Sequence, residues 1–74
     1  MSALRQRLPR AERRAQLLRV ATELFARRGF RGTTTRAIAA AAGVSEIILF
    51  RLFPTKQDLY WAVIEEKCRQ RPAT

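Results

Sequence analysis

The sequence predicts a small all-α fold, in which a three-helix bundle containing a helix-turn-helix is followed by a fourth helix. Three observations support this prediction. Apolar residues recur at helical spacing along most of the chain, 47% of the 74 residues are hydrophobic, and Gly29, Gly43 and Pro54 interrupt the helical pattern where turns are needed. A chain of this length forms a single domain, close to the size below which one core confers little stability.

The first helix is expected over residues 10–28. Residues 1–9 show no apolar period and are interpreted as a flexible basic arm that ends at Pro9, a residue suited to the first turn of a helix. The apolar residues of the helix then form one stripe, which consists of Leu17, Leu18, Ala21, Leu24 and Phe25. Gly29 is expected to end the helix.

The second helix is expected over residues 35–42. Three consecutive hydroxyls, from Thr33, Thr34 and Thr35, lie at its start, although a helix needs only one of them as its N-cap. Capping is the favoured role of Thr35. The other hydroxyls and the free N–H groups of this helix start are suited to holding a phosphate, with capping alone as the alternative.

The third helix completes the helix-turn-helix and is expected over residues 45–52. Gly43 supplies the sharp turn before it, and Pro54 ends it by disfavouring helical geometry at Phe53. Both helices direct apolar side chains toward a common core, namely Ile38, Ala39 and Ala42 from the second and Leu49, Leu52 and Phe53 from the third. A helix so placed can enter the major groove of DNA.

The fourth helix is expected over residues 56–69, because residues 55–58 match a capping box. It has two apolar faces, one with Leu59, Ala62 and Val63 and the other with Trp61, Ile64 and Cys68. The first face can cover the core. We infer that the second face packs against a further domain or a second subunit, an inference that a buried Trp61 would contradict.

Composition argues against several classes of protein. No stretch approaches the roughly 20 apolar residues of a membrane span, and the N-terminus lacks the apolar region of a signal peptide, so a cytoplasmic protein without a membrane partner is expected. With one cysteine, Cys68, and no histidine, neither a disulfide, a metal nor a cofactor is expected. Catalysis is not expected either, since the only carboxylate pair is Glu65 and Glu66 and no nucleophile has a base.

The charge of the chain indicates a polyanionic partner. It has 15 Lys and Arg against 6 Asp and Glu, a net charge of +9, of which residues 1–36 contribute +8. Thirteen of the cations are Arg, which suits bidentate contact with phosphates or guanine, although a GC-rich genome gives the same bias. Arg10, Arg13 and Arg14 crowd the positive end of the first helix, where either an external anion or solvent offsets their repulsion.

Base contacts are expected on the outward face of the third helix. With Leu49 toward the core, Ile47 and Arg51 point outward, and Ile48 and Phe50 lie at the flanks. Arg51 can donate a bidentate pair to guanine or hold a phosphate. Ile47 or Ile48 can pack on a thymine methyl, with exposure without function as the alternative.

Three neighbouring residues each keep two interpretations. Glu46 can accept from cytosine N4 or simply stabilise the helix N-terminus, and the second role is favoured. Phe50 can pack on sugar and backbone or belong mostly to the core. Lys56 can give its ammonium to a phosphate, across the groove from Arg36 and the threonines, or remain a solvated surface residue.

Together these residues resemble the TetR family of bacterial transcriptional regulators. The resemblance runs from about residue 13 to residue 63 and rests on an ordered set, Leu24-Phe25, Gly29-Phe30, Thr33-Thr34, Ile38-Ala39, Ala42-Gly43-Val44-Ser45, Leu49-Phe50, Phe53, Lys56 and Leu59. It implies a homeodomain-like DNA-binding head over residues 10–54, and a fourth helix over residues 55–74 that leads to an absent C-terminal domain for ligand binding and dimerisation. It also implies a homodimer on a palindromic operator in double-stranded DNA, and repression released by a small-molecule inducer whose site is not in this chain.

The resemblance further implies roles for particular residues. Thr34, Thr35 and Lys56 would contact phosphate, Arg36 would occupy a position that can read a base, and residues 45–51, from Ser45 to Arg51, would form the recognition helix.

Two departures limit this transfer. Many members have a tyrosine at the position of Phe50, whose hydroxyl contacts a phosphate, and that hydroxyl is absent here. Glu46, Ile47 and Ile48 are bulkier and more apolar than the usual small residues, so the operator cannot be taken from a relative.

Two other functions stay open on the residues alone. One is a protein-interaction module that uses the face of Trp61, Ile64 and Cys68 and has only non-specific DNA affinity. The other is a basic amphipathic binder of membrane surfaces. Neither explains the helix-turn-helix pattern.

Overall fold

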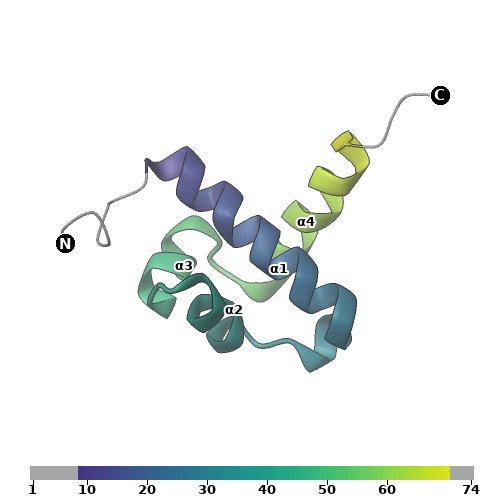
Figure 1. The fold of residues 1–74 in the computed structure, drawn as a ribbon, viewed down its shortest axis with the longest axis horizontal. Coiled ribbons are helices and arrows are strands. Elements are labelled where there is room, and N and C mark those ends of the chain that lie inside the picture. The colour runs from purple at the N-terminus through teal and green to yellow at the C-terminus, as the bar shows by residue number, and fades with distance from the viewer. Residues whose placement is uncertain (1–8, 71–74) are drawn as a thin grey trace.

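The computed structural model describes residues 9–70, which form four helices and no strand (Figure 1). The helices are α1 (Arg10–Gly32), α2 (Thr35–Ala42), α3 (Glu46–Leu52) and α4 (Lys56–Gln70). This architecture confirms the predicted all-α fold class. The proposed basic arm lies outside the described residues except for Pro9, as do residues 71–74.

The helix α1 is interrupted at Gly29. This glycine has a φ of +78° and a ψ of 171°, a conformation that residues with a side chain rarely adopt, so the regular helix ends at Arg28 as predicted. A further helical turn then reaches Gly32, where the sequence predicted only a connection. That turn places the ring of Phe30 5.9 Å from Phe25 and 5.0 Å from Tyr60 of α4, and this packing is its physical cause.

The N-cap of α2 is Thr34, so the prediction that favoured Thr35 is wrong. Thr34 has an extended backbone, and its Oγ1 accepts a hydrogen bond from the Ala37 N–H at 3.0 Å. Thr35 is already the first helical residue of α2. Its hydroxyl is therefore available for a partner outside α2.

Local hydrogen bonds close the helix-turn-helix. Gly43 adopts the left-handed conformation predicted for the turn, with a φ of +75°, and the N–H groups of Gly43 and Val44 donate to carbonyls in the last turn of α2. Ser45 caps α3 by accepting from the Ile48 N–H at 3.3 Å. Phe53, directly before Pro54, is extended and ends α3 as predicted.

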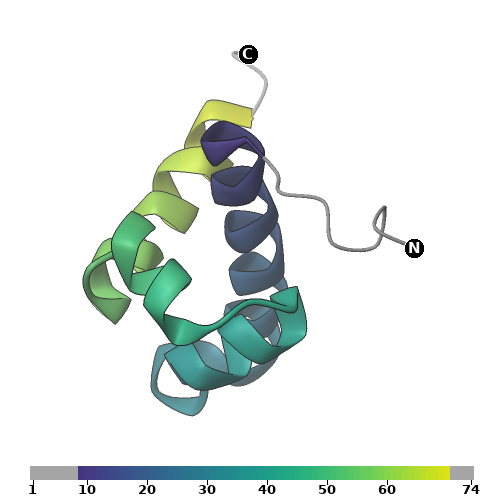
Figure 2. The same ribbon diagram turned by 90° about the vertical axis from the view of Figure 1, so that its left-hand side faces the viewer.

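The four helices share one core. Each contributes one large aliphatic residue that is fully buried, namely Leu17, Ile38, Leu49 and Leu59. In the views of Figures 1 and 2, α2 and α3 pack on one side of α1, and the C-terminal end of α4 points away from them. Gln16 Nε2 donates to the Ala42 carbonyl at 3.3 Å, and the Arg14 guanidinium lies 5.2 Å from the centre of the Phe53 ring. Contacts with α1 thus set the orientation of the helix-turn-helix.

The helix α4 has the two faces that the sequence predicted. Leu59, Ala62 and Val63 are buried in the core, whereas Trp61 is 64% exposed and Cys68 is exposed. Ile64 is half-buried, and the exposure of Trp61 agrees with a second apolar face that residues 9–70 do not fully cover. Within residues 9–70, no helix is long and apolar enough to cross a membrane.

Candidate nucleic-acid interface

The outer surface of α3 is the first part of the candidate interface. Leu49 is fully buried, while Ile47 is 67% exposed and Arg51 is exposed, which confirms the outward direction predicted for both. Ile48 lies at the flank and is also exposed. A helix of seven residues therefore presents two isoleucines and an arginine to solvent.

Phe50 also belongs to this surface. The interpretation that placed it mostly in the core is wrong, because 40% of the residue is exposed. Leu49 and Phe53, which are both buried, already occupy the core side of α3 and its C-terminal end. The Phe50 ring can offer apolar contact only, since it has no hydroxyl.

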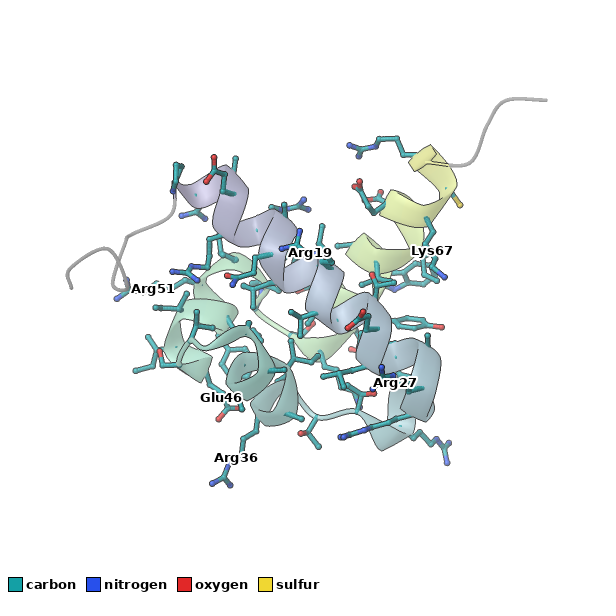
Figure 3. The ribbon with its side chains drawn as sticks, viewed as in Figure 1. Arg19, Arg27, Arg36, Glu46, Arg51 and Lys67 are labelled. Atoms are coloured by element: carbon teal, nitrogen blue, oxygen red, sulfur yellow. The ribbon has the colours of Figure 1, made fainter. Side chains whose placement is uncertain are left out.

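The side of the molecule formed by α2 and α3, here called the α2–α3 face, is basic apart from one carboxylate. Glu46 is the only acidic residue between Glu23 and Asp58 in the sequence. Figure 3 shows Arg36, Glu46 and Arg51 on this face, whereas Arg19 and Lys67 extend from α1 and α4. Such a distribution favours a polyanion against the α2–α3 face.

Each hydroxyl has one proton to donate, and the three threonines near the start of α2 differ in whether that proton already has an acceptor in the protein. Thr33 is fully buried, and its Oγ1 donates to the carbonyls of Leu24 and Gly29 at 3.1 and 2.8 Å. It therefore belongs to the end of α1, and its predicted place in a phosphate site is wrong. Thr34 is exposed and uses its oxygen to accept from Ala37, so its proton remains available to a phosphate.

The third hydroxyl, that of Thr35, donates to Glu46. The distance from Thr35 Oγ1 to Glu46 Oε2 is 3.0 Å, and both residues are half-buried. A proton donated to a carboxylate is not available to a phosphate, so the phosphate contact implied for Thr35 would require this bond to break. Glu46 is the first residue of α3, a position compatible with both of its interpretations.

Two further hydroxyls combine a helix cap with an available proton. Ser45 and Thr55 are exposed, and each accepts a hydrogen bond from a backbone N–H at the start of its helix. Thr55 is missing from the predicted site. Its capping box was the signal that could have identified it, because an exposed cap places a donor beside the free N–H groups of a helix start.

Lys56 is held against an aromatic ring rather than freely solvated. Its Nζ lies 4.2 Å from the centre of the Phe30 ring, and the residue is half-buried. Arg36 is exposed in the first turn of α2 and has no such partner among residues 9–70. The phosphate contact of Lys56 and the base contact of Arg36 stay predictions.

Away from the α2–α3 face, residues 9–70 form a groove. A groove of about 370 Å³ lies between the N-terminal half of α1 and the C-terminal half of α4, where Leu18, Arg19 and Lys67 are among its lining residues. It lies outside the α2–α3 face. In the described part of the chain, no group of three or more His, Cys, Asp and Glu side chains could hold a metal ion.

Comparison with known proteins agrees with this geometry. Residues 17–63 match the model of the family described as bacterial regulatory proteins, tetR family. The chain is 48% identical over 59 residues to the HTH-type transcriptional activator FasR of Mycolicibacterium smegmatis, which covers 80% of this chain and 27% of that protein. It is 43% identical over 63 residues to the HTH-type transcriptional repressor Rv3405c of Mycobacterium tuberculosis, which covers 82% of this chain and 34% of that protein.

A third relative is named as a nucleoid occlusion factor and not as a transcriptional regulator. The chain is 46% identical over 55 residues to the nucleoid occlusion factor SlmA of Pasteurella multocida, with 73% of this chain and 28% of that protein covered. The chain thus spans about a third of the length of these relatives or less. No solved structure matches it.

Proposed function

Because this chain belongs to the tetR family of bacterial regulatory proteins and contains the helix-turn-helix of a DNA-binding transcriptional regulator, we propose that α3 enters the major groove of an operator and reads its bases. The observation that carries the proposal is the outer surface of α3, where Ile47, Ile48 and Arg51 face solvent. Arg51 can donate a bidentate pair to guanine, and the isoleucines can pack on thymine methyls. This is a binding function and not a catalytic one.

Phosphate contacts in this proposal come from the starts of three helices. Thr34 caps α2, Ser45 caps α3 and Thr55 caps α4, and each hydroxyl keeps a proton to donate. Lys56 directly follows the last of these caps as the first residue of α4. Helix starts attract anions through their free N–H groups, so these four residues would fix the register of the head on the duplex, while Arg36 reads a base beside α3.

In the whole protein we place this head in a homodimer on a palindromic operator, with half-sites roughly 34–36 Å apart. The face of Trp61, Ile64 and Cys68 on α4 would pack against a C-terminal ligand-binding and dimerisation domain, for which the greater length of the relatives leaves room. The proposed regulation is repression released by a small-molecule inducer, in the cytoplasm and at the nucleoid. The name of Rv3405c supports repression, whereas that of FasR would support activation.

Fluorescence anisotropy tests the proposal with two duplexes of equal length, one from upstream of the gene for this protein and one with a scrambled sequence. We expect the chain to prefer the upstream duplex and to bind both more weakly as salt rises. Arg51→Ala should remove the preference and weaken binding by about 1–3 kcal/mol. Because a single head lacks the avidity of a dimer, the titration extends to high protein concentration.

Arg19→Ala is the matched control, since it removes the same charge from an exposed position in the groove between α1 and α4. It should leave the preference between the two duplexes unchanged. Equal binding of both duplexes by the unaltered chain would contradict sequence reading. An equal loss on both from Arg51→Ala would instead mean that Arg51 holds a phosphate.

A further inference from the structure

Glu46 is a carboxylate on a face that otherwise suits a polyanion, and Thr35 holds it in place. Thr35 is the first residue of α2 and Glu46 the first of α3, so their 3.0 Å hydrogen bond joins the starts of the two helices of the helix-turn-helix. Both residues are half-buried. The orientation of the Glu46 carboxylate is therefore set by a residue of the other helix.

This orientation decides which group Glu46 can present to DNA. Oε2 accepts from Thr35, and within residues 9–70 no hydrogen bond to Oε1 is found. A carboxylate oxygen only accepts, so the group that remains is an acceptor. The first residues of a recognition helix are those that reach base edges in the major groove.

A carboxylate at this position affects different sequences unequally. It repels the phosphate backbone of every duplex and so weakens binding to all of them. Only a base with a donor in the major groove offsets that repulsion through a hydrogen bond. Specificity arises in this way from penalising the wrong partners as well as from attracting the right one. The cap of α3 is already supplied by Ser45 and does not need Glu46.

We propose that Glu46 determines specificity at one base pair, with its Oε1 accepting a hydrogen bond from the N4 amino group of a cytosine, and that Thr35 is the residue that positions it. The proposal rests on the function proposed above for α3. Cytosine is preferred over adenine, because adenine places its N7 acceptor beside the N6 donor, where it would repel the carboxylate. Thr35 then acts through Glu46 and not through a phosphate.

The substitution Glu46→Gln inverts the group that faces the base. The Thr35 hydroxyl holds the amide oxygen, so the NH₂ group takes the place of Oε1 and presents donors. The preferred base should change from cytosine to guanine or thymine, whose major-groove groups at this position are acceptors. When Thr35→Val is added, the amide can turn, and its bidentate pair with adenine becomes available.

The experiment selects duplexes from a randomised pool with the unaltered chain, Glu46→Gln, Thr35→Val and the double variant, and compares the selected bases at every position. We expect a change of about tenfold in relative preference at one base pair for Glu46→Gln, and adenine there for the double variant. Thr35→Val alone should weaken the preference for cytosine at that pair only. Melting temperatures verify that each variant is folded.

Glu12→Gln is the matched control, because Glu12 is an exposed carboxylate in the first turn of α1 and the same charge is removed. It should select the same sequence as the unaltered chain. An unaltered chain that enriches no base at any position would overturn the proposed function and this inference together. A clear preference that Glu46→Gln reproduces without change would overturn the inference alone, and Glu46 would then only join α2 to α3.

Discussion

The ammonium of Lys56 lies over the Phe30 ring, 4.2 Å from its centre, so the first residue of α4 is bound to the last turn of α1. Phe30 also packs against Phe25 and Tyr60, with ring centroids 5.9 and 5.0 Å away. The ring shields part of the lysine and holds its charge at the start of α4. The position of this cation is therefore a consequence of aromatic packing between α1 and α4.

Lys56→Ala should weaken DNA binding by a similar factor on every sequence and reduce the slope of log affinity against log salt by about 1, because a phosphate contact carries no sequence information. Loss of the contact with Phe30 should also lower the free energy of unfolding by roughly 0.5–1 kcal/mol. Anisotropy over a salt series and urea denaturation measure the two effects. Lys67→Ala is the control, since Lys67 is exposed in the groove between α1 and α4. If Lys56→Ala left the salt slope unchanged, Lys56 would not contact a phosphate.

Valine substitutions at Thr33 and Thr34 should separate stability from DNA affinity. Thr33→Val removes the hydroxyl of a fully buried residue, which donates to the carbonyls of Leu24 and Gly29, and should lower the free energy of unfolding by about 0.5–1.5 kcal/mol. Thr34→Val removes the cap of α2, which should lower the free energy of unfolding by about 1 kcal/mol, and it also removes the proposed phosphate donor, so it should weaken binding to all duplexes. Denaturation and anisotropy on the same samples measure both quantities. Equal affinity of the folded Thr34 variant and the unaltered chain would argue against the phosphate contact.

Gly43→Ala should lower the free energy of unfolding by about 1–2 kcal/mol, because the φ of +75° is a left-handed backbone conformation that alanine adopts only at a cost. Apart from Gly43 and its two neighbours in the chain, a Cβ at this position would meet no atom within 4 Å, so the penalty arises within the local backbone and not from a clash with another part of the fold. Gly43→Asn should restore part of the stability, since asparagine adopts this conformation more readily. Thermal denaturation of the two variants compares their stability. If the Gly43→Ala variant were more stable than the Gly43→Asn variant, this prediction would be contradicted.

Leu49→Ala should lower the free energy of unfolding by about 2–5 kcal/mol, because Leu49 is fully buried on the core side of α3. In a chain of 74 residues that loss is large enough to populate the unfolded state. Trp61→Ala removes a larger side chain but should change the stability of this chain by less than about 0.5 kcal/mol, because the indole is exposed. Urea denaturation measures the free energy of unfolding of both variants. If Trp61→Ala lowered it as much as Leu49→Ala, the indole would stabilise this chain directly.

The boundaries of the helices could be predicted because they depend on neighbours in sequence. Glycine at a left-handed position, serine before a helix and proline after one act within a few residues, so the ends of α2 and α3 follow from the chain itself. The outward direction of Ile47 and Arg51 follows in the same way, once Leu49 is assigned to the core.

The predictions that failed concern residues whose surroundings come from elsewhere in the chain. Of the two interpretations of Phe50, the one that placed it mostly in the core failed, because 40% of the residue is exposed, which the helical period alone does not reveal. The extra turn after Gly29 forms because Phe30 packs against Tyr60, a residue 30 positions later in the sequence. Thr35 looked like a cap because its hydroxyl precedes most of α2, and its actual partner, Glu46, belongs to the next helix.

The sequence by itself determined that residues 9–70 form four helices, that two of them make a helix-turn-helix and that the chain is basic, since these properties depend on local spacing and composition. Only the tertiary structure decided which hydroxyl protons remain available to DNA. Three adjacent threonines have the same chemistry, yet Thr33 donates to carbonyls of α1, Thr34 keeps its proton and Thr35 donates to the Glu46 carboxylate. The reason is that a hydroxyl has one proton, and the acceptor that takes it is chosen by packing between helices.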